Sequence, residues 1–352
     1  MGPGGVGKTT VAAALGLAAA RRGRRVIVVT IDPSRRLAQA LGLDPARGHA
    51  PGSIVPVEAP GGVRLDSLVL DTRSVFDEIV RVYSPDAAAA RRMLDNPIYQ
   101  ATARHLGGAL EYAATARVHM LHAEGNYDLI VLDTPPTANA LDFLDAPGHL
   151  QELVSNPAAR FLAGTGRLGA KLLGLGGGVF LKTFEAMGGG SFIAELGVFL
   201  KEFGAVLGEF RRRAGDLQQL LGSVETGAVF TTAATDFSAR EAEGFIDVIV
   251  ERTMRVDGIV LNRVLPTISP QPPASALQPA VAAQVSEDAV EATVAMLGQA
   301  YRGARLQSER AHRILHGLRE RYPDVPVAVL DRRDPPPASL EDLVEMGERL
   351  LG

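Results

Sequence analysis

Glycines, one lysine and two threonines near the start of the chain have the types and the spacing needed to bind phosphate. Residues 2–10 read Gly-Pro-Gly-Gly-Val-Gly-Lys-Thr-Thr and fit G-x-x-x-x-G-K-[ST], the pattern of a phosphate-binding loop. Glycines let backbone N–H groups approach phosphate oxygens where a Cβ would block them. Lys8 would bring its ammonium group to the β- and γ-phosphates, and Thr9 would ligate Mg²⁺. The predicted nucleotide-binding residues are Gly4, Gly5, Val6, Gly7, Lys8, Thr9 and Thr10.

A helix and a strand must position this loop. The Ala/Leu-rich segment from Thr10 to Arg22 predicts a helix that points its positive end at the anion. The simpler alternative is a glycine-rich turn that only caps a helix. It does not explain the complete G-x-x-x-x-G-K-[ST] pattern. The loop should also follow a buried strand of about 5–6 residues, but Met1 lies almost at the first glycine. We expect the first strand to be missing, either because the sequence begins too late or because the chain is a fragment.

Two predicted strands end in an aspartate. The β-branched run 26–29 leads to Asp32, and the apolar run 127–132 leads to Asp133. Ligands bind at the carboxyl ends of strands in open α/β sheets. An apolar strand ending in Asp is weak evidence by itself, but beside a phosphate-binding loop it indicates the carboxylate that holds Mg²⁺. We therefore predict Thr9 and Asp133 as metal ligands, with a switch loop following Asp133.

The rest of the chain alternates strand and helix patterns, which predicts an α/β fold with a doubly wound, mostly parallel sheet and a helical subdomain. Further strands are expected at 65–70, 227–232, 256–264 and 325–330. Helices are expected within about 75–124 and at 241–251, 289–321 and 339–351. The predicted domains are 1–149 and 223–352, two parts of one nucleotide-binding domain, and an insert at 150–222. A proline-rich, exposed linker is expected at 266–279.

The predicted insert, residues 150–222, is apolar and rich in glycine, with breaks at 176–178 and 188–190. Two interpretations stay open. Its helices could simply pack on their own domain, or they could form a mobile surface for a hydrophobic partner. The glycine breaks favour the second interpretation.

Composition excludes several classes of function. The 352 residues carry a net charge of −4 and contain no cysteine. The charge gives no basic footprint for nucleic acid or an anionic membrane. The missing cysteines exclude disulfides and thiolate metal sites within this chain and fit a cytoplasmic protein.

The motifs resemble a known family. The loop at 2–10, the turn at 30–33 and the turn at 133–137, which reads Asp-Thr-Pro-Pro-Thr, are similar to those of the ArsA-type ATPases. That family has a deviant Walker A loop and includes the arsenite-pump ATPase and the ATPase that targets tail-anchored membrane proteins. The resemblance is densest in 2–42 and 108–147, and bacterial members often continue as this chain does.

The resemblance implies roles for single residues and an assembly. Lys8 and Thr9 would hold phosphate and Mg²⁺, and Asp133 would be the metal aspartate. Asp32 would position or activate the attacking water, so the implied catalytic residues are Asp32 and Lys8. Asn262 sits where family members read adenine. Members act as dimers with nucleotides at the interface, closed by ATP.

Three departures from the family pattern matter. The second lysine of the loop, which reaches the partner's nucleotide, is replaced by Pro3, so hydrolysis across a dimer would need a related subunit that retains it. Arsenite-binding cysteines and a CxxC zinc clasp are absent, and Asn139 replaces the histidine of the second switch.

Three functional hypotheses stay open. The first is a Mg²⁺-dependent ATPase whose dimeric switch handles a hydrophobic or membrane-protein partner. The second is the ATPase subunit of an anion-extrusion pump. The third is a poorly hydrolysing nucleotide-binding subunit of a heterodimer. All three place the protein in the cytoplasm, peripheral to a membrane only through a partner, and without nucleic acid.

Overall fold

The computed structural model describes most of the chain outside the predicted insert. The described residues are 1–31, 37, 40–41, 52–100, 110–134, 199, 202–204, 206, 216, 219–269 and 272–351. The helices among them are α1 (Lys8–Arg21), α3 (Thr72–Tyr83), α4 (Ala87–Leu94), α6 (Leu110–Glu124), α12 (Asp236–Glu251), α13 (Ala274–Ala282), α14 (Val290–Arg321) and α15 (Leu340–Leu351), with short 3-10 turns η2 (Pro60–Gly62) and η5 (Glu287–Ala289). The strands are β1 (Val26–Thr30), β2 (Ile54–Ala59), β3 (Val63–Val69), β4 (Leu129–Asp133), β5 (Gly227–Ala233), β6 (Arg255–Val264) and β7 (Val327–Asp331).

The first sheet has the order β2-β3-β1-β4. β1 runs parallel to both β3 and β4, whereas β2 pairs antiparallel with β3. Alternate residues of β1 point to opposite faces. Val26 and Val28 join a cluster with α1 and α15, while Ile27 and Val29 join one with α3 and α6. Helices therefore cover both faces of β1, as its continuous apolar run predicts.

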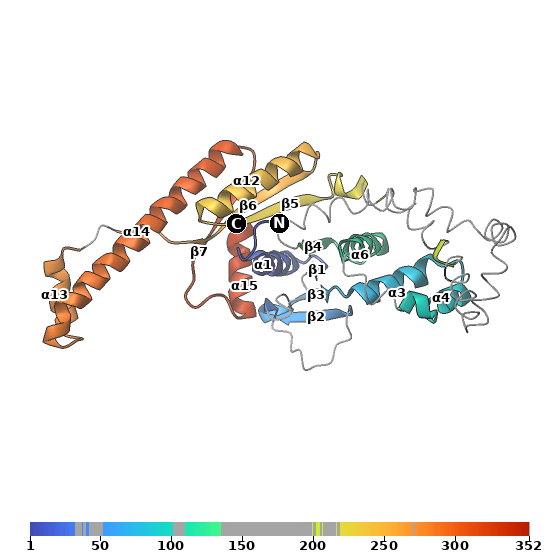
Figure 1. Ribbon diagram of the computed structural model, residues 1–352, viewed down its shortest axis with the longest axis horizontal. Helices are drawn as coiled ribbons and strands as arrows, with labels where there is room; N and C mark the ends of the chain where they lie inside the picture. The colour runs from blue at the N-terminus through green and yellow to red at the C-terminus, as the bar shows by residue number, and fades with distance from the viewer. Residues whose placement is uncertain are drawn as a thin grey trace, which may run out of the picture.

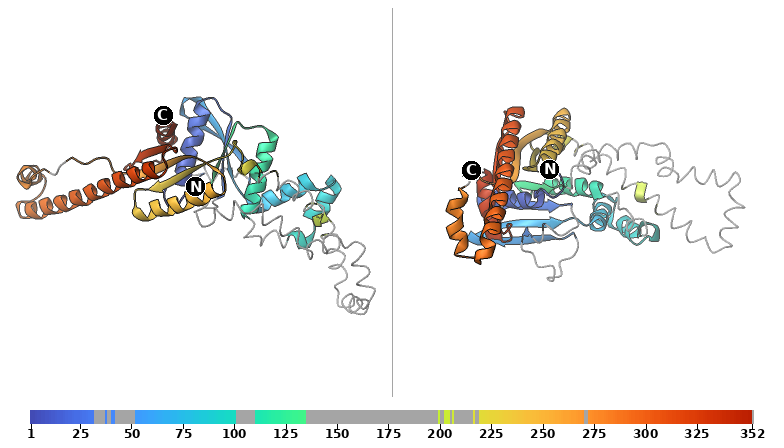
Figure 2. Two further views of the ribbon diagram at one scale, coloured as in Figure 1. Left: turned by 90° about the horizontal axis from the view of Figure 1, so that it is seen from above. Right: turned by 60° about the vertical axis from the view of Figure 1, so that its left-hand side comes forward.

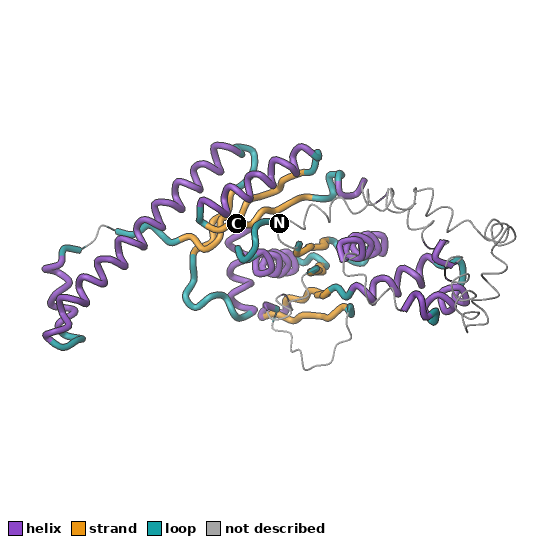
Figure 3. Tube along the Cα trace, in the orientation of Figure 1, coloured by secondary structure: helices purple, strands orange, loops and turns teal. Residues whose placement is uncertain are grey.

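The second sheet, β5-β6-β7, is entirely parallel. One face packs against α12 and the second half of α14 through Phe230, Ile246 and Leu318. The other face packs against α1 and α15 through Val260, Val11 and Met346. α1 and α15 thus contribute to the cores of both sheets, which lie side by side in Figures 1 and 3. The predicted α/β fold with mostly parallel sheets is confirmed, and it is consistent with a P-loop NTPase.

The two sheets do not pair with each other through β4 and β5 in the described residues. Residues 129–132 of β4 are apolar but only half-buried. On the other side of the gap, β5 pairs with the chain start. The Met1 ammonium group donates to the Val229 carbonyl oxygen (2.7 Å), and the Thr231 N–H donates to the Met1 carbonyl oxygen (2.8 Å).

Side-chain caps fix the starts of α3, α4 and α12. The Asp71 carboxylate accepts from the Ser74 N–H at the start of α3, and the Asp86 carboxylate accepts from the Ala89 N–H at the start of α4. The Thr235 hydroxyl accepts from the Ser238 N–H and begins α12, earlier than the helix predicted at 241–251. These bonds satisfy N–H groups that have no partner within the helix.

α13 and the first half of α14 extend away from the two sheets (Figures 1 and 2). This arrangement differs from the linker predicted at 266–279, because α13 begins at Ala274 and contains Pro279. Alanine-rich sequence favours a helix, and one internal proline removes only one helix hydrogen bond, although its ring also strains the preceding turn. The helix predicted at 289–321 is confirmed as α14.

Most of the predicted insert lies outside the described residues. The part that the structure describes includes Phe199 and Phe203, which stack with ring centroids 5.1 Å apart and pack beside Met93 and Tyr99. Glu202 forms a 2.7 Å ion pair with Arg92 of α4. Within the residues described, no helix has both the length and the apolar character needed to cross a bilayer.

The contact between α1 and α15 depends on Gly347. A Cβ at this position would meet the Ala14 carbonyl oxygen and lie 2.8 Å from the Ala18 Cβ. We predict that Gly347→Ala lowers the free energy of unfolding by about 1–3 kcal/mol, because the two helices must separate. Gly317→Ala in α14 is the matched control, since open space surrounds Gly317 and alanine favours a helix. Urea denaturation should show opposite signs for the two variants, and equal effects would contradict this packing.

Candidate functional site

The predicted phosphate-binding loop leads directly into α1. Gly7 is the residue before the helix and has φ of +96°, a left-handed conformation that favours glycine. No side chain among the described residues caps this helix N-terminus. Val6 is buried and anchors the loop, and Gly7 and Thr10 beside it line a hollow. This is the geometry in which backbone N–H groups and the helix dipole attract an anion.

Lys8 folds back over the loop. Its ammonium group donates to the carbonyl oxygens of Gly2 (2.8 Å) and Pro3 (2.7 Å). The positive charge is therefore held at the loop that the sequence assigned to phosphate. Phosphate oxygens would offer this ammonium charge-assisted hydrogen bonds, which are stronger than those to neutral carbonyls.

Asp133 lies where β4 ends, opposite Thr30 of β1. The Thr30 hydroxyl donates to the Asp133 carboxylate (3.0 Å), and the Thr9 side chain hydrogen-bonds the same carboxylate. Burial raises the pKa of Asp133, while the bonds from Thr9 and Thr30 and the charge of Lys8 oppose that rise. The structure thus brings Asp133 beside Lys8 and Thr9, which lie more than a hundred positions earlier in the sequence.

A further hydroxyl beside this cluster was not singled out from the sequence. Thr134 follows Asp133, is 4% exposed, and its hydroxyl has no hydrogen-bond partner among the described residues. A carboxylate and hydroxyls are the hard oxygen donors that Mg²⁺ prefers. The chemistry of these residues therefore fits the predicted metal.

Several predicted site residues lie outside the described part of the chain. They are Asp32, the turn at 135–137 and Asn139. The catalytic role of Asp32 and the switch after Asp133 stay predictions.

Asn262, at the end of β6, contacts the phosphate-binding loop. Its Nδ2 donates to the Val6 carbonyl oxygen (2.8 Å), and its Oδ1 accepts from the Arg263 N–H (2.9 Å). A Cβ on Gly7 would lie 2.5 Å from that Nδ2. The family resemblance implied that Asn262 contacts adenine. The structure shows that its side chain links the loop to the second sheet, and leaves the contact with a base as a prediction.

A hollow of about 710 Å³ opens beside Gly7 and Thr10. It lies at the carboxyl ends of the parallel strands β5, β6 and β7, where ligands bind in α/β sheets. Lining residues that sequence reasoning missed are Thr235, Arg263, Gln307, Arg310, Asp331, Arg332, Arg333, Asp334, Pro336, Pro337 and Arg349. One signal could have found part of this set. The charged and proline-rich residues 331–337 directly follow a predicted strand, where a ligand-binding loop is expected.

The fold and the site define a P-loop nucleotide-binding protein of the α/β class. A family model described as "Anion-transporting ATPase" matches residues 1–287. The chain therefore belongs to the ArsA anion-transporting ATPase family, which confirms the resemblance and the expected nucleotide-binding class.

Three relatives illustrate the comparison. An arsenical pump-driving ATPase of Acidiphilium multivorum is 30% identical over 164 residues, covering 44% of this chain and 26% of the relative. The ATPase GET3 of Malassezia globosa is 27% identical over 154 residues, covering 44% and 43%. An uncharacterized protein of Streptomyces coelicolor is 35% identical over 159 residues, covering 43% and 36%. The matches thus span less than half the length of these relatives.

The bond from Asn262 to Val6 should be measurable. We predict that Asn262→Ala lowers the free energy of unfolding by about 1–3 kcal/mol, because the buried Val6 carbonyl loses its partner. Urea denaturation tests this, with Asn126→Ala as the control, since Asn126 is exposed and donates a 3.3 Å hydrogen bond to the exposed Glu124. Equal stability of the two variants would show that the Asn262 bond does not stabilise the loop.

Proposed function

We propose that this protein binds ATP with Mg²⁺ at the loop 2–10 and hydrolyses the β–γ phosphoanhydride bond. One observation carries the proposal, the convergence of Lys8, Thr9 and Asp133 at the N-terminus of α1. The chain belongs to a family of ATPases, which implies the nucleotide. The hollow beside Gly7 and Thr10 has room for the nucleoside.

Each residue has a separate task in this proposal. Lys8 exchanges the Gly2 and Pro3 carbonyls for phosphate oxygens and stabilises charge that develops there. Thr9 and Asp133 would hold Mg²⁺, which supplies electrostatic stabilisation of the phosphates. Asp32 orients the attacking water and accepts its proton, as the family resemblance implies.

A further strand between β4 and β5 belongs to this proposal. Among the described strands β4 pairs only with β1, its residues 129–132 are half-buried, and the Met1 backbone already bonds to β5. A parallel strand that ends at Gly2 would pair with both neighbours and join the two sheets into one. It would also bury the open side of β4 beside the nucleotide site.

The proposal also has to say what the ATPase cycle drives. We favour a dimeric switch that handles a hydrophobic or membrane-protein partner, because the family is typically dimeric and the predicted insert is apolar. The name of one relative supports an anion pump as the alternative, but without cysteines this chain cannot bind arsenite through thiolates. Pro3 supports the third possibility, a poorly hydrolysing subunit that needs a related partner.

Lys8→Ala tests nucleotide binding. We predict that this change weakens ATP affinity by roughly 100-fold or more, because two charge-assisted hydrogen bonds to phosphate are lost. Isothermal titration with Mg·ATP measures the affinity. Arg24→Ala is the control, since Arg24 lies beyond the other end of α1 and donates to the Asp128 carbonyl. Unchanged affinity in Lys8→Ala would remove the basis of the proposal.

Asp32→Asn tests hydrolysis separately from binding. We predict wild-type ATP affinity and a turnover reduced by about 100-fold or more, because the amide cannot accept the proton of the attacking water. Asp128→Asn is the control, because that carboxylate pairs with Arg25 at the opposite end of β4. Phosphate release is measured for each variant alone and mixed with a related ATPase that retains the second loop lysine. Wild-type turnover in Asp32→Asn would assign the water to another group.

A further inference from the structure

Arg263 has a backbone conformation that few side chains adopt. It lies near the end of β6, directly after Asn262, and its φ is +59°. Left-handed φ values favour glycine, because a Cβ then crowds the following carbonyl oxygen. Among the described residues only Thr253 shares this feature without being glycine. Thr253 lies in an exposed turn after α12, whereas Arg263 lies beside the candidate site.

The pairing of β6 with β7 is irregular at the same place. Leu261 pairs with Val329, but the next pair joins Val264 to Asp331. Two residues of β6 therefore stand against one residue of β7, which is a β-bulge. Bulges re-aim a side chain and are common next to active sites. Arg263 lines the hollow of about 710 Å³ beside the phosphate-binding loop, so the bulge presents its side chain there.

Hydrogen bonds on both sides hold the backbone of Arg263 in place. Before it, the Asn262 side chain accepts from the Arg263 N–H (2.9 Å) and donates to the Val6 carbonyl oxygen (2.8 Å). After it, the Val264 carbonyl oxygen accepts from the Arg332 N–H (2.8 Å). The bulge is therefore fixed to the loop on one side and to the end of β7 on the other.

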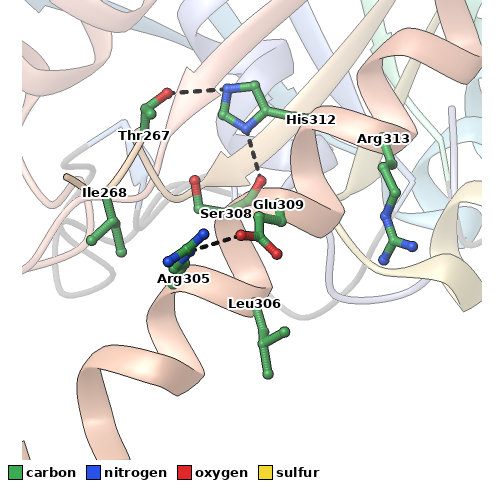
Figure 4. A pocket seen from close by; sticks show the side chains of 8 residues that line it. All are labelled: Thr267, Ile268, Arg305, Leu306, Ser308, Glu309, His312 and Arg313. Carbon is green, nitrogen blue, oxygen red and sulfur yellow. Dashed lines mark hydrogen bonds and ion pairs between the residues drawn. The ribbon is translucent and has the colours of Figure 1, made fainter. Parts of the chain in front are cut away.

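The segment that follows Arg263 is fixed to α14. The Ser308 hydroxyl donates to the Pro266 carbonyl oxygen (3.0 Å). The His312 ring bonds to the Thr267 hydroxyl (3.2 Å) and to the Ser308 carbonyl oxygen (2.8 Å), within a second hollow of about 680 Å³ (Figure 4). A strained residue persists only where the surrounding structure determines its conformation, and these contacts meet that condition for Arg263.

The guanidinium group of Arg263 has no partner among the described residues. Arg263 is exposed, and the one hydrogen bond described for it uses its backbone N–H. Three other arginines that line the same hollow are paired with carboxylates: Arg310 with Asp236, Arg333 with Glu345 and Arg349 with Asp331. A strained backbone thus presents an unpaired guanidinium to the hollow, which indicates a ligand contact.

We propose that Arg263 stacks its guanidinium plane on the base of the bound nucleotide. This inference rests on the proposed function, which places the nucleoside in this hollow and the triphosphate at Lys8 and the loop 2–10. Leu265 and Leu330 give the hollow apolar wall next to the bulge, which suits a flat base. A guanidinium is planar and weakly hydrated, and bases stack on it in protein complexes. Glycine would relieve the strain at this position but would leave the base without this contact.

Two ligands separate this role from phosphate binding. Isothermal titration measures the affinity for Mg·ATP and for Mg·tripolyphosphate, which has no base. Arg263→Ala should weaken ATP binding about tenfold and leave tripolyphosphate binding unchanged. Arg263→Lys keeps the charge but loses the plane, so it should weaken ATP binding as alanine does. Lys8→Ala should weaken the binding of both ligands.

Arg255→Ala is the matched control, because Arg255 is an exposed arginine at the opposite end of β6 and pairs with Asp257. It should bind both ligands like the wild type.

The melting temperature without ligand tests the strain separately. Arg263→Gly should melt about 2 °C above Arg263→Ala, because glycine adopts this φ freely and alanine does not. It should nevertheless bind ATP as weakly as Arg263→Ala. Thr253→Gly and Thr253→Ala should differ in melting temperature in the same direction. Both should bind ATP like the wild type, because Thr253 precedes β6 and the hollow lies at the other end of that strand.

The outcomes that contradict this inference differ from those that contradict the proposed function. Equal losses of ATP and tripolyphosphate affinity in Arg263→Ala would assign the guanidinium to the phosphates and overturn the inference. Full ATP affinity in Arg263→Ala, recovery in Arg263→Lys, or equal melting temperatures of the alanine and glycine variants would also overturn it. A wild type that binds neither ligand would overturn the proposed function, and this inference with it.

Discussion

The attachment of the phosphate-binding loop to both sheets is the constraint on which the rest of the structure depends. Met1 bonds to β5, and the Asn262 side chain bonds the Val6 carbonyl to the end of β6. On the other side of the loop, α1 packs against β1 and β3. The loop therefore spans the junction between the two sheets, both of which also pack against α1 and α15. A ligand that orders the loop would stabilise this junction as well.

The same arrangement explains the electrostatics of the site. Parallel pairing of β1 with β4 sets Thr30 opposite Asp133, and α1 begins close enough for Thr9 to reach the same carboxylate. Burial alone would favour a neutral carboxyl group. The two hydroxyls and the Lys8 ammonium favour its charged form, which is the form that binds a cation. The orphaned Thr134 hydroxyl adds a polar group that a bound water or ion would satisfy.

Local patterns predicted the elements that carry the chemistry, and non-local contacts decided what the sequence could not reveal. The loop motif and the apolar run before Asp133 pointed to Lys8, Thr9 and Asp133, which the structure brings together, because strand ends and glycine spacing are local signals. The edge strand β2 was missed, because Ile54–Ala59 contains a proline and a glutamate. Its antiparallel pairing with β3 also cannot be inferred from the residues of either segment alone. The hollow beside Gly7 is formed by the ends of three strands together with α14 and α15, so no single segment predicts it. The contact from Asn262 to Val6 joins residues more than 250 positions apart.

Hydrogen exchange of the backbone amides, with and without Mg·ATP, tests the central claim most directly. The account predicts that ATP slows exchange in two separate segments, residues 2–10 of the loop and residues 260–263 at the end of β6, because the loop and Asn262 act as one unit. Protection of the loop alone would contradict the attachment of the loop to the second sheet. Protection of neither segment would contradict the assignment of this loop as the nucleotide site.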